Sequence, residues 1–190
     1  GKNMADKNNA SNVTAAKPKI GGAIYMAPKG TELPTDAEAA LDTQFQNLGF
    51  VSEDGLENAN SASSENVKEW GGSIVNTMLK EKEDKFKFTL IEALNLHVLK
   101  LIYGEKNVTG TLETGITIKS KSEDYEEKSF VVDMVLKSGV IKRMVLPLAK
   151  VSEVGDVKYA GGENIGYETT LSAFPDGDGN THYEYIKKVG

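Results

Sequence analysis

Alternating apolar and polar residues predict that most of the chain forms β-strands. The clearest case is KFKFTL, near the middle of the chain, in which phenylalanine and leucine alternate with lysine and threonine. Successive side chains of a strand point to opposite faces, so one face of this strand is expected to be buried and the other wet, as in an antiparallel sheet. Strands are predicted within residues 20–27, 45–52, 73–90, 112–120, 129–137, 140–148, 158–159, 166–174 and 181–188.

A helical period replaces the alternation after the KFKFTL strand. Thr89 and Glu92 have the spacing of a capping box, and Gly104 provides a C-terminal stop. The apolar residues between them fall mainly on one arc of a 3.6-residue wheel, which predicts an amphipathic helix. A shorter helix is predicted at residues 35–43.

These elements together predict a mainly β fold, an antiparallel β-sandwich or small barrel with one flanking α-helix. Residues 20–190 are expected to form a single domain. Residues 1–19 are small, polar and lysine-bearing, which predicts a flexible N-terminal arm, and Gly1–Asn3 ahead of Met4 are interpreted as a cloning remnant. The polar segment at about 53–72 has few core-sized residues and is predicted to be a long loop, which inside a compact domain is usually functional or disordered.

Trp70, the only tryptophan, lies at the far end of this segment. In one interpretation its side chain anchors the loop on the core. In the other it is an interface anchor, because tryptophan is enriched at binding hot spots.

Composition narrows the class of protein. Lys and Arg number 22 against 28 Asp and Glu, a net charge of −6, and an acidic chain is a poor candidate for gripping nucleic acid. The absence of cysteine excludes disulfides, thiolate metal sites and cysteine nucleophiles. No apolar run is long enough for a transmembrane helix, so no membrane anchor is expected.

The stretch FPDGDGNTHYEY places Asp176, Asp178 and Asn180 at alternating positions, like the first ligands of a calcium-binding loop. The loop would need glycine where Thr181 stands and glutamate where Lys187 stands. Proline, glycine, aspartate and asparagine in this order favour a β-turn instead. The sequence therefore predicts no metal site, although an adventitious cation at the two aspartates stays open.

Other catalytic signatures are missing from the sequence. His97 and His182 do not have metal-ligand spacing, and there is no nucleophile elbow and no phosphate-binding loop. We therefore expect neither an enzyme nor a cofactor. One alternative is a β-sandwich that recognises carbohydrate or protein on a cell surface, with Phe174, Tyr183 and Tyr185 as a stacking platform.

A series of short motifs from residue 51 to residue 110 indicates the class of protein more specifically than composition does. The motifs are, in order, Ser52–Gly55, Trp70–Gly72, Phe86–Glu92 and Gly104. In this order they resemble the major tail proteins of long, non-contractile-tailed bacteriophages.

The resemblance implies a structural virion protein with a β-sandwich or small barrel and one flanking helix. It implies hexameric rings whose inner sheets join into one barrel and that stack into the tail tube. The implied partners are further copies of the chain, the tape-measure protein and tail-tip proteins, and genomic DNA passes through the lumen without specific binding. The protein would be made in the cytoplasm of the host bacterium and reside in the virion.

The resemblance also implies where copies meet. The segment at 53–72 would make contacts between rings or subunits, and the candidate residues are Glu53, Asp54, Glu65 and Trp70. Residues 73–90 and 129–148 are expected to line the lumen. Lysines on the first of these segments would then need acidic partners; they are Lys80, Lys82, Lys85 and Lys87.

Overall fold

The structure is a computed structural model that describes residues 7–61, 64–79 and 83–190; within these ranges, the side chains of residues 64–66 and 75–79 are not described. One large antiparallel sheet dominates the structure. The sheet has the order β3-β2-β10-β11-β12-β7-β4, with β1 beside β10 and β13 beside β11, and two further strand pairs are β5–β6 and β8–β9. The strands are β1 (Lys17–Pro18), β2 (Ile24–Pro28), β3 (Gln46–Asn47), β4 (Val51–Ser61), β5 (Ser64–Lys68), β6 (Ile74–Leu79), β7 (Glu83–Leu90), β8 (Val108–Thr111), β9 (Gly115–Ile118), β10 (Lys128–Val135), β11 (Val140–Val154), β12 (Tyr167–Ala173) and β13 (Tyr183–Lys188). The helices are α1 (Leu96–Tyr103) and 3-10 turns at Ala10–Asn12, Glu105–Asn107 and Lys137–Gly139.

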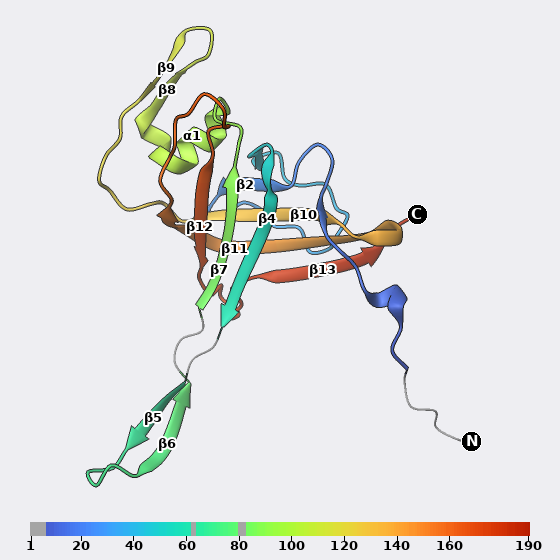
Figure 1. Ribbon diagram of the computed structural model, residues 1–190, viewed down its shortest axis with the longest axis vertical. Helices are drawn as coiled ribbons and strands as arrows, with labels where there is room; N and C mark the ends of the chain where they lie inside the picture. The colour runs from blue at the N-terminus through green and yellow to red at the C-terminus, as the bar shows by residue number, and fades with distance from the viewer. Residues whose placement is uncertain (1–6, 62–63, 80–82) are drawn as a thin grey trace.

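The long strand β11 divides the sheet into two halves. Its first part, from Val140 to Val145, pairs with β13 on one side and β10 on the other, and from Ala149 onward it pairs with β12. The register slips opposite Pro147, which has no N–H to donate to a ladder. Figure 1 shows β10, β11 and β13 running across the direction of β4, β7 and β12. The predicted mainly β sandwich with one helix is confirmed, and among the described strands the sheet does not close into a barrel.

The main core lies between the two halves of the sheet and under α1. The KFKFTL alternation is confirmed, because Phe86, Phe88 and Leu90 are all buried there. A second, smaller cluster covers the opposite face of β10 and β11, with Val131 and Val145 at its centre. Residues 129–133 and 143–146 are thus covered on both faces, so the expectation that they line a lumen is wrong for these residues, whereas the turn between the two strands is exposed.

The predicted hairpin between β10 and β11 is also confirmed. Ser138 and Gly139 both have positive φ angles, of 58° and 73°, as a two-residue turn between twisted strands requires.

Helix α1 begins later than predicted. Its N-cap is Asn95, whose side chain accepts a hydrogen bond from the backbone N–H of His97, and its C-cap is Gly104 with φ 102°. Thr89, the predicted cap, lies in β7, because this strand stays paired with β12 as far as Leu90. None of the helices in the described part of the chain combines the length and apolar character that crossing a bilayer requires.

Two short elements are also placed differently. Residues 35–43 do not form a helix, because the Asp36 carboxylate accepts the N–H groups of Glu38 and Ala39 and closes a bend. Residues 158–159 are not in a strand.

The segment at 53–72 is mostly β-strand, and the prediction of a long loop is wrong. We use the word ribbon for β4 and β7 together with the β5–β6 hairpin that lies beyond them. Strand β4 occupies its first part and β5 most of the rest. The hairpin of β5 and β6 lies well away from the sandwich, beyond the ends of β4 and β7 (Figure 1). Leu56 alone of β4's later residues packs on the core, so the strand lacks the alternating pattern from which a half-buried strand is recognised.

Candidate assembly surface

The tip of the ribbon exposes Trp70. A backbone hydrogen bond from Gly72 N–H to the carbonyl of Glu69 closes the turn, and Gly72 takes the positive φ of 87° that the turn needs. The Trp70 side chain is fully exposed, at 102% of its reference area. The interpretation that Trp70 anchors the segment on the core is therefore wrong, and the interface interpretation stays a prediction.

The structure does not bring the four predicted contact residues together. Glu53 and Asp54 are exposed near the start of β4, beside the bulge that separates the Val51 and Leu56 pairings with β7. Trp70 lies at the opposite end of the ribbon. Glu65 is in β5, and its side chain lies outside the described residues.

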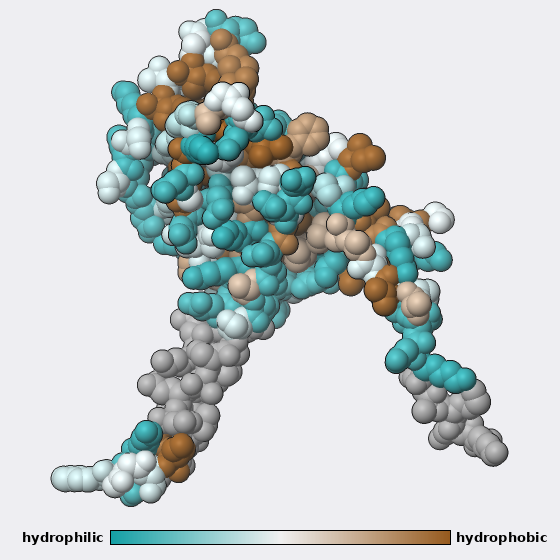
Figure 2. Space-filling view, in the orientation of Figure 1, coloured by the Kyte–Doolittle hydropathy of each residue, from teal (hydrophilic) through white to brown (hydrophobic). Residues whose placement is uncertain are grey.

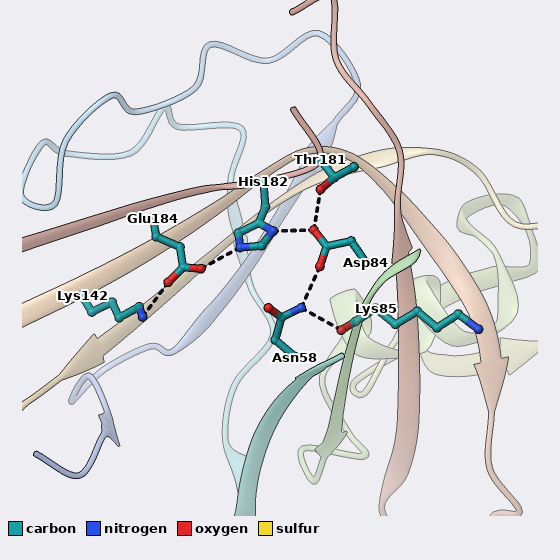
Figure 3. Close-up of polar contacts among 7 residues, drawn as sticks. All are labelled: Asn58, Asp84, Lys85, Lys142, Thr181, His182 and Glu184. Atoms are coloured by element: carbon teal, nitrogen blue, oxygen red, sulfur yellow. Dashed lines mark hydrogen bonds and ion pairs between the residues drawn. The ribbon is translucent and has the colours of Figure 1, made fainter. Parts of the chain in front are cut away.

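A buried polar network fixes the place where the ribbon leaves the sandwich (Figure 3). Its centre is Asp84, whose carboxylate accepts hydrogen bonds from the amide of Asn58 at 2.8 Å and the hydroxyl of Thr181 at 2.6 Å, and contacts the Nδ1 atom of His182. Asn58 belongs to β4 and Asp84 to β7, whereas Thr181 and His182 precede β13. The network therefore links both strands of the ribbon to the other half of the sandwich.

The network continues from His182 to the surface. The imidazole Nε2 lies 2.8 Å from Glu184, and the ammonium of Lys142 lies 2.6 Å from the same carboxylate. These contacts from Lys142 and then His182 hold the pKa of Glu184 below its usual value. The rings of His182 and Phe86 also pack edge to face, with their centroids 5.1 Å apart. This packing and the polar contacts together fix one orientation of the His182 ring.

Sequence reasoning did not single out Asp84, which lies in the charge-rich stretch KEKEDK. A signal existed, because Asp84 is in phase with Phe86, Phe88 and Leu90 and so points to the buried face. Its exposed fraction is 2%.

The outer face of the half-sheet formed by β4, β7, β12 and the end of β11 is polar. Its outward positions are Glu57, Ala59, Lys85, Lys87, Thr89, Lys150, Glu153, Glu168, Thr170 and Ser172. Lys87 pairs with Glu168 at 3.2 Å, and Lys85 lies 3.9 Å from Glu83. Two of the lysines noted in the sequence thus have acidic neighbours, whereas Lys80 and Lys82 lie outside the described residues.

The same half-sheet has two unpaired edges. Within the described residues, β4 pairs only with β7, and residues 150–154 of β11 pair only with β12, because β10 reaches no further than Ala149. Asp124 contacts Lys150 at 2.9 Å beside the second edge. Strand β1 comes close to β4 but is paired with β10 and not with β4. Edge strands without a hydrogen-bonded neighbour can add a strand from another chain.

Exposed apolar side chains lie at both ends of the molecule, and others, such as Val135 and Ile186, lie on the β10 and β13 side. Figure 2 shows hydrophilic groups over β4, β7 and β12, and hydrophobic groups at the upper end over β8 and β9 and on the distant hairpin. Leu112 is 58% exposed at the β8–β9 turn, and Ile74 is 58% exposed beside the hairpin tip. Such surfaces at opposite ends are suited to end-to-end contacts between copies.

The FPDGDGNTHYEY stretch forms the predicted turn. Asp176 accepts hydrogen bonds from the N–H groups of Asp178 and Asn180, at 3.0 and 2.9 Å, and from the hydroxyl of Tyr183. The Tyr183 hydroxyl, followed by these amides, holds the pKa of Asp176 below its usual value. The Asp176 oxygens thus serve the turn, and the described residues contain no group of three acidic or histidine side chains placed to hold a metal ion.

The chain as a whole matches one family model. The model describes the phage tail tube protein, and the match runs from residue 4 to residue 189, nearly the full length. This chain belongs to the phage tail tube protein family. No curated protein sequence matches it significantly.

Family membership makes this a structural protein of the bacteriophage tail that assembles with copies of itself and with other tail components. Its location is the tail of the virion. The polar half-sheet, its two open edges and the apolar ends are therefore the candidate assembly surfaces of the tail tube protein.

Proposed function

We propose that this tail tube protein forms hexameric rings that stack into the tail tube of a long, non-contractile-tailed bacteriophage, and that genomic DNA passes through the tube. The observation that carries the proposal is the half-sheet with two open edges and a polar outer face. Pairing the β4 edge of one copy with the 150–154 edge of the next joins the half-sheets into a continuous ring.

The strand directions support this closure. Along the order β4, β7, β12, β11, each neighbouring pair is antiparallel. Four alternating strands leave β4 and the end of β11 running in opposite directions, so a neighbouring copy related by rotation about the ring axis adds an antiparallel partner. Every junction in the ring then has the same hydrogen-bonding pattern as the sheet itself.

The polar face would line the lumen. Its lysines are accompanied by glutamates, as the 3.2 Å contact of Lys87 with Glu168 illustrates. Phosphate binding depends on unneutralised positive charge, so a face of paired lysines offers DNA little to hold. We expect DNA and the tape-measure protein to occupy this lumen at different stages.

The β5–β6 hairpin, together with the N-terminal arm, would contact the next ring, and tail-tip proteins would start the stack. The protein would be synthesised in the cytoplasm of the host bacterium. The alternative of a carbohydrate-binding module has less support, because Tyr183 and Tyr185 stack on each other with centroids 6.4 Å apart and pack on the second core cluster.

Two experiments test the proposal. Negative-stain electron microscopy of concentrated protein, with light scattering, should show hollow rings or tubes with six-fold end views. In the cysteine-free chain, Ala59→Cys with Glu153→Cys places thiols on the two edges, and a short bismaleimide should give a ladder that ends at the hexamer. A protein that stays monomeric even with tail tips as seeds would refute the tube.

A further inference from the structure

A shallow depression lies at the end of the β4–β7 pair opposite the hairpin. It has a volume of about 620 Å³ and is lined by Ile91, Glu92, Ala93, Leu94, Asn95, Asn164 and Ile165. Leu94 is 69% exposed, although it is a large apolar residue. Phe50 adjoins the depression, because its carbonyl accepts the N–H of Ile91 at 3.1 Å, and its own side chain is 73% exposed.

The polar groups of the depression are held in place. The Glu92 carboxylate accepts the backbone N–H of Phe50 at 2.6 Å and the amide of Asn95 at 3.4 Å. Asn95 is fixed in turn as the N-cap of α1, where it accepts the N–H of His97. An apolar floor therefore meets rigid carboxylate and amide oxygens that can accept a hydrogen bond.

We propose that this depression receives Trp70 from a copy of the same chain in the adjacent ring. The inference rests on the proposed stacking of rings and names the surface that the hairpin meets. An indole needs an apolar surface for its rings and an acceptor for its N–H, and the depression provides both. Lys68, exposed next to the tip, would meet the negative charge of Glu92.

The positions of the two surfaces favour a second copy as the occupant. Trp70 lies in the turn of the β5–β6 hairpin, beyond one end of β4 and β7, and the depression lies at their other end. Hydrophilic groups cover β4 and β7 between them (Figures 1 and 2). A copy displaced along the strand direction presents its depression to the tip. Contacts between opposite ends do not close on themselves, so each added ring exposes a new depression and growth continues in one direction.

Cross-linking distinguishes this site from other surfaces at the same end. The chain has no cysteine, so Trp70→Cys with Leu94→Cys introduces the only two thiols. With a short bismaleimide we expect covalent species that extend beyond the hexamer. The matched control is Trp70→Cys with Leu112→Cys, whose leucine is exposed on the β8–β9 turn at the same end. Cross-linking through Leu112 and not Leu94 would overturn the proposed docking site.

A second variant tests the energetic role of the site. Leu94→Asn should leave rings intact and raise the protein concentration at which tubes appear by at least about tenfold, as expected for a residue that supports a buried tryptophan. Leu112→Asn should have little effect. If wild-type protein forms tubes and Leu94→Asn forms them equally well, the proposed docking site is wrong, whereas the proposal that the protein forms a tube is supported. If wild-type protein forms neither rings nor tubes with tail tips present, the proposed function itself fails.

Discussion

The Nδ1 atom of His182 contacts the Oδ2 atom of Asp84, although the two residues are 98 positions apart in the sequence. Asp84 lies in β7 where the ribbon leaves the sandwich, and His182 lies just before β13. Each ring nitrogen of His182 faces a carboxylate, Asp84 on one side and Glu184 on the other. These contacts hold the ribbon in place where it leaves the sandwich, so that its tip can reach a neighbouring copy.

Removing the Asp84 carboxylate should destabilise the protein. Asp84→Ala removes the acceptor of the half-buried Thr181 hydroxyl and one acceptor of the Asn58 amide, and it leaves the buried Nδ1 atom of His182 without its polar partner. We expect a loss of about 2–4 kcal/mol in the free energy of unfolding. Urea denaturation measures the loss, and hydrogen exchange should show faster exchange of the β4 amides. The matched control is Asp178→Ala in the exposed turn nearby. Equal stability of the two variants would contradict a structural role for the network.

The contribution of Glu184 should depend on pH. Lys142 first, and then His182, lower the pKa of Glu184 in the folded protein, so the ionised form stabilises the fold. The stabilisation is fully present above the unfolded-state pKa of about 4.3 and is lost as the pH falls through the lower folded-state pKa. The difference in melting temperature between wild type and Glu184→Gln should therefore shrink below about pH 4. A difference that stays constant between pH 7 and pH 3 would show that ionisation of Glu184 is not involved.

The buried ion pair of Arg143 and Asp133 should tolerate lysine poorly. The Arg143 guanidinium donates to both oxygens of Asp133, at 2.7 and 3.2 Å, and to the carbonyls of Asp36 and Ala39. Lysine keeps the charge but cannot reproduce this fork, so we expect Arg143→Lys to cost about 2–4 kcal/mol of unfolding free energy.

Thermal or urea denaturation of Arg143→Lys measures this cost. The exposed pair of Lys29 and Glu127 offers a comparison, because its 3.1 Å contact lies at the surface. Lys29→Ala should change the stability by less than about 1 kcal/mol. If Arg143→Lys and Lys29→Ala change the free energy of unfolding by the same amount, burial does not make the Arg143–Asp133 pair more important than an exposed pair.

Fluorescence of Trp70 should report assembly directly. Trp70 is the only tryptophan and is fully exposed in the single chain. If the hairpin tip contacts the next ring, emission should shift to shorter wavelength, and acrylamide quenching should fall, as tubes form. A matched reporter is Trp70→Phe with Tyr159→Trp, since Tyr159 is 69% exposed and is not among the residues that line the depression. Tubes in which Trp70 stays as accessible to acrylamide as in the free chain would exclude the tip from the interface.

Much of the fold could be predicted because local patterns encode it. The alternation through Phe86 and Phe88 predicted a half-buried strand, and Ser138 with Gly139 predicted the hairpin turn. The end of α1 at Gly104 was also predictable, since glycine takes the positive φ without penalty. The beginning of the helix was not, because Thr89 and Asn95 both have capping side chains and only the pairing of β7 with β12 decides between them.

The candidate surfaces were harder to predict. Trp70 was identified from its rarity, but the sequence left open whether it faces the core or the solvent. Residues 129–148 contain apolar runs that would suit lumen or core strands alike, and only the second cluster around Val131 and Val145 shows that the strands are covered on both faces there.

The sequence by itself determined the antiparallel β class, the single main helix and the tight turns, because these depend on residue spacing and on local backbone preferences. The family was indicated by the resemblance of the ordered motifs between residues 51 and 110. Only the tertiary structure decided that residues 51–61 form an edge strand, that Asp84 is buried beside His182, and that β4 and the end of β11 are left as open edges. The physical reason is that an edge strand is held by backbone hydrogen bonds to its neighbour, which any side chain permits, and a buried carboxylate is stabilised by donors that are distant in the sequence.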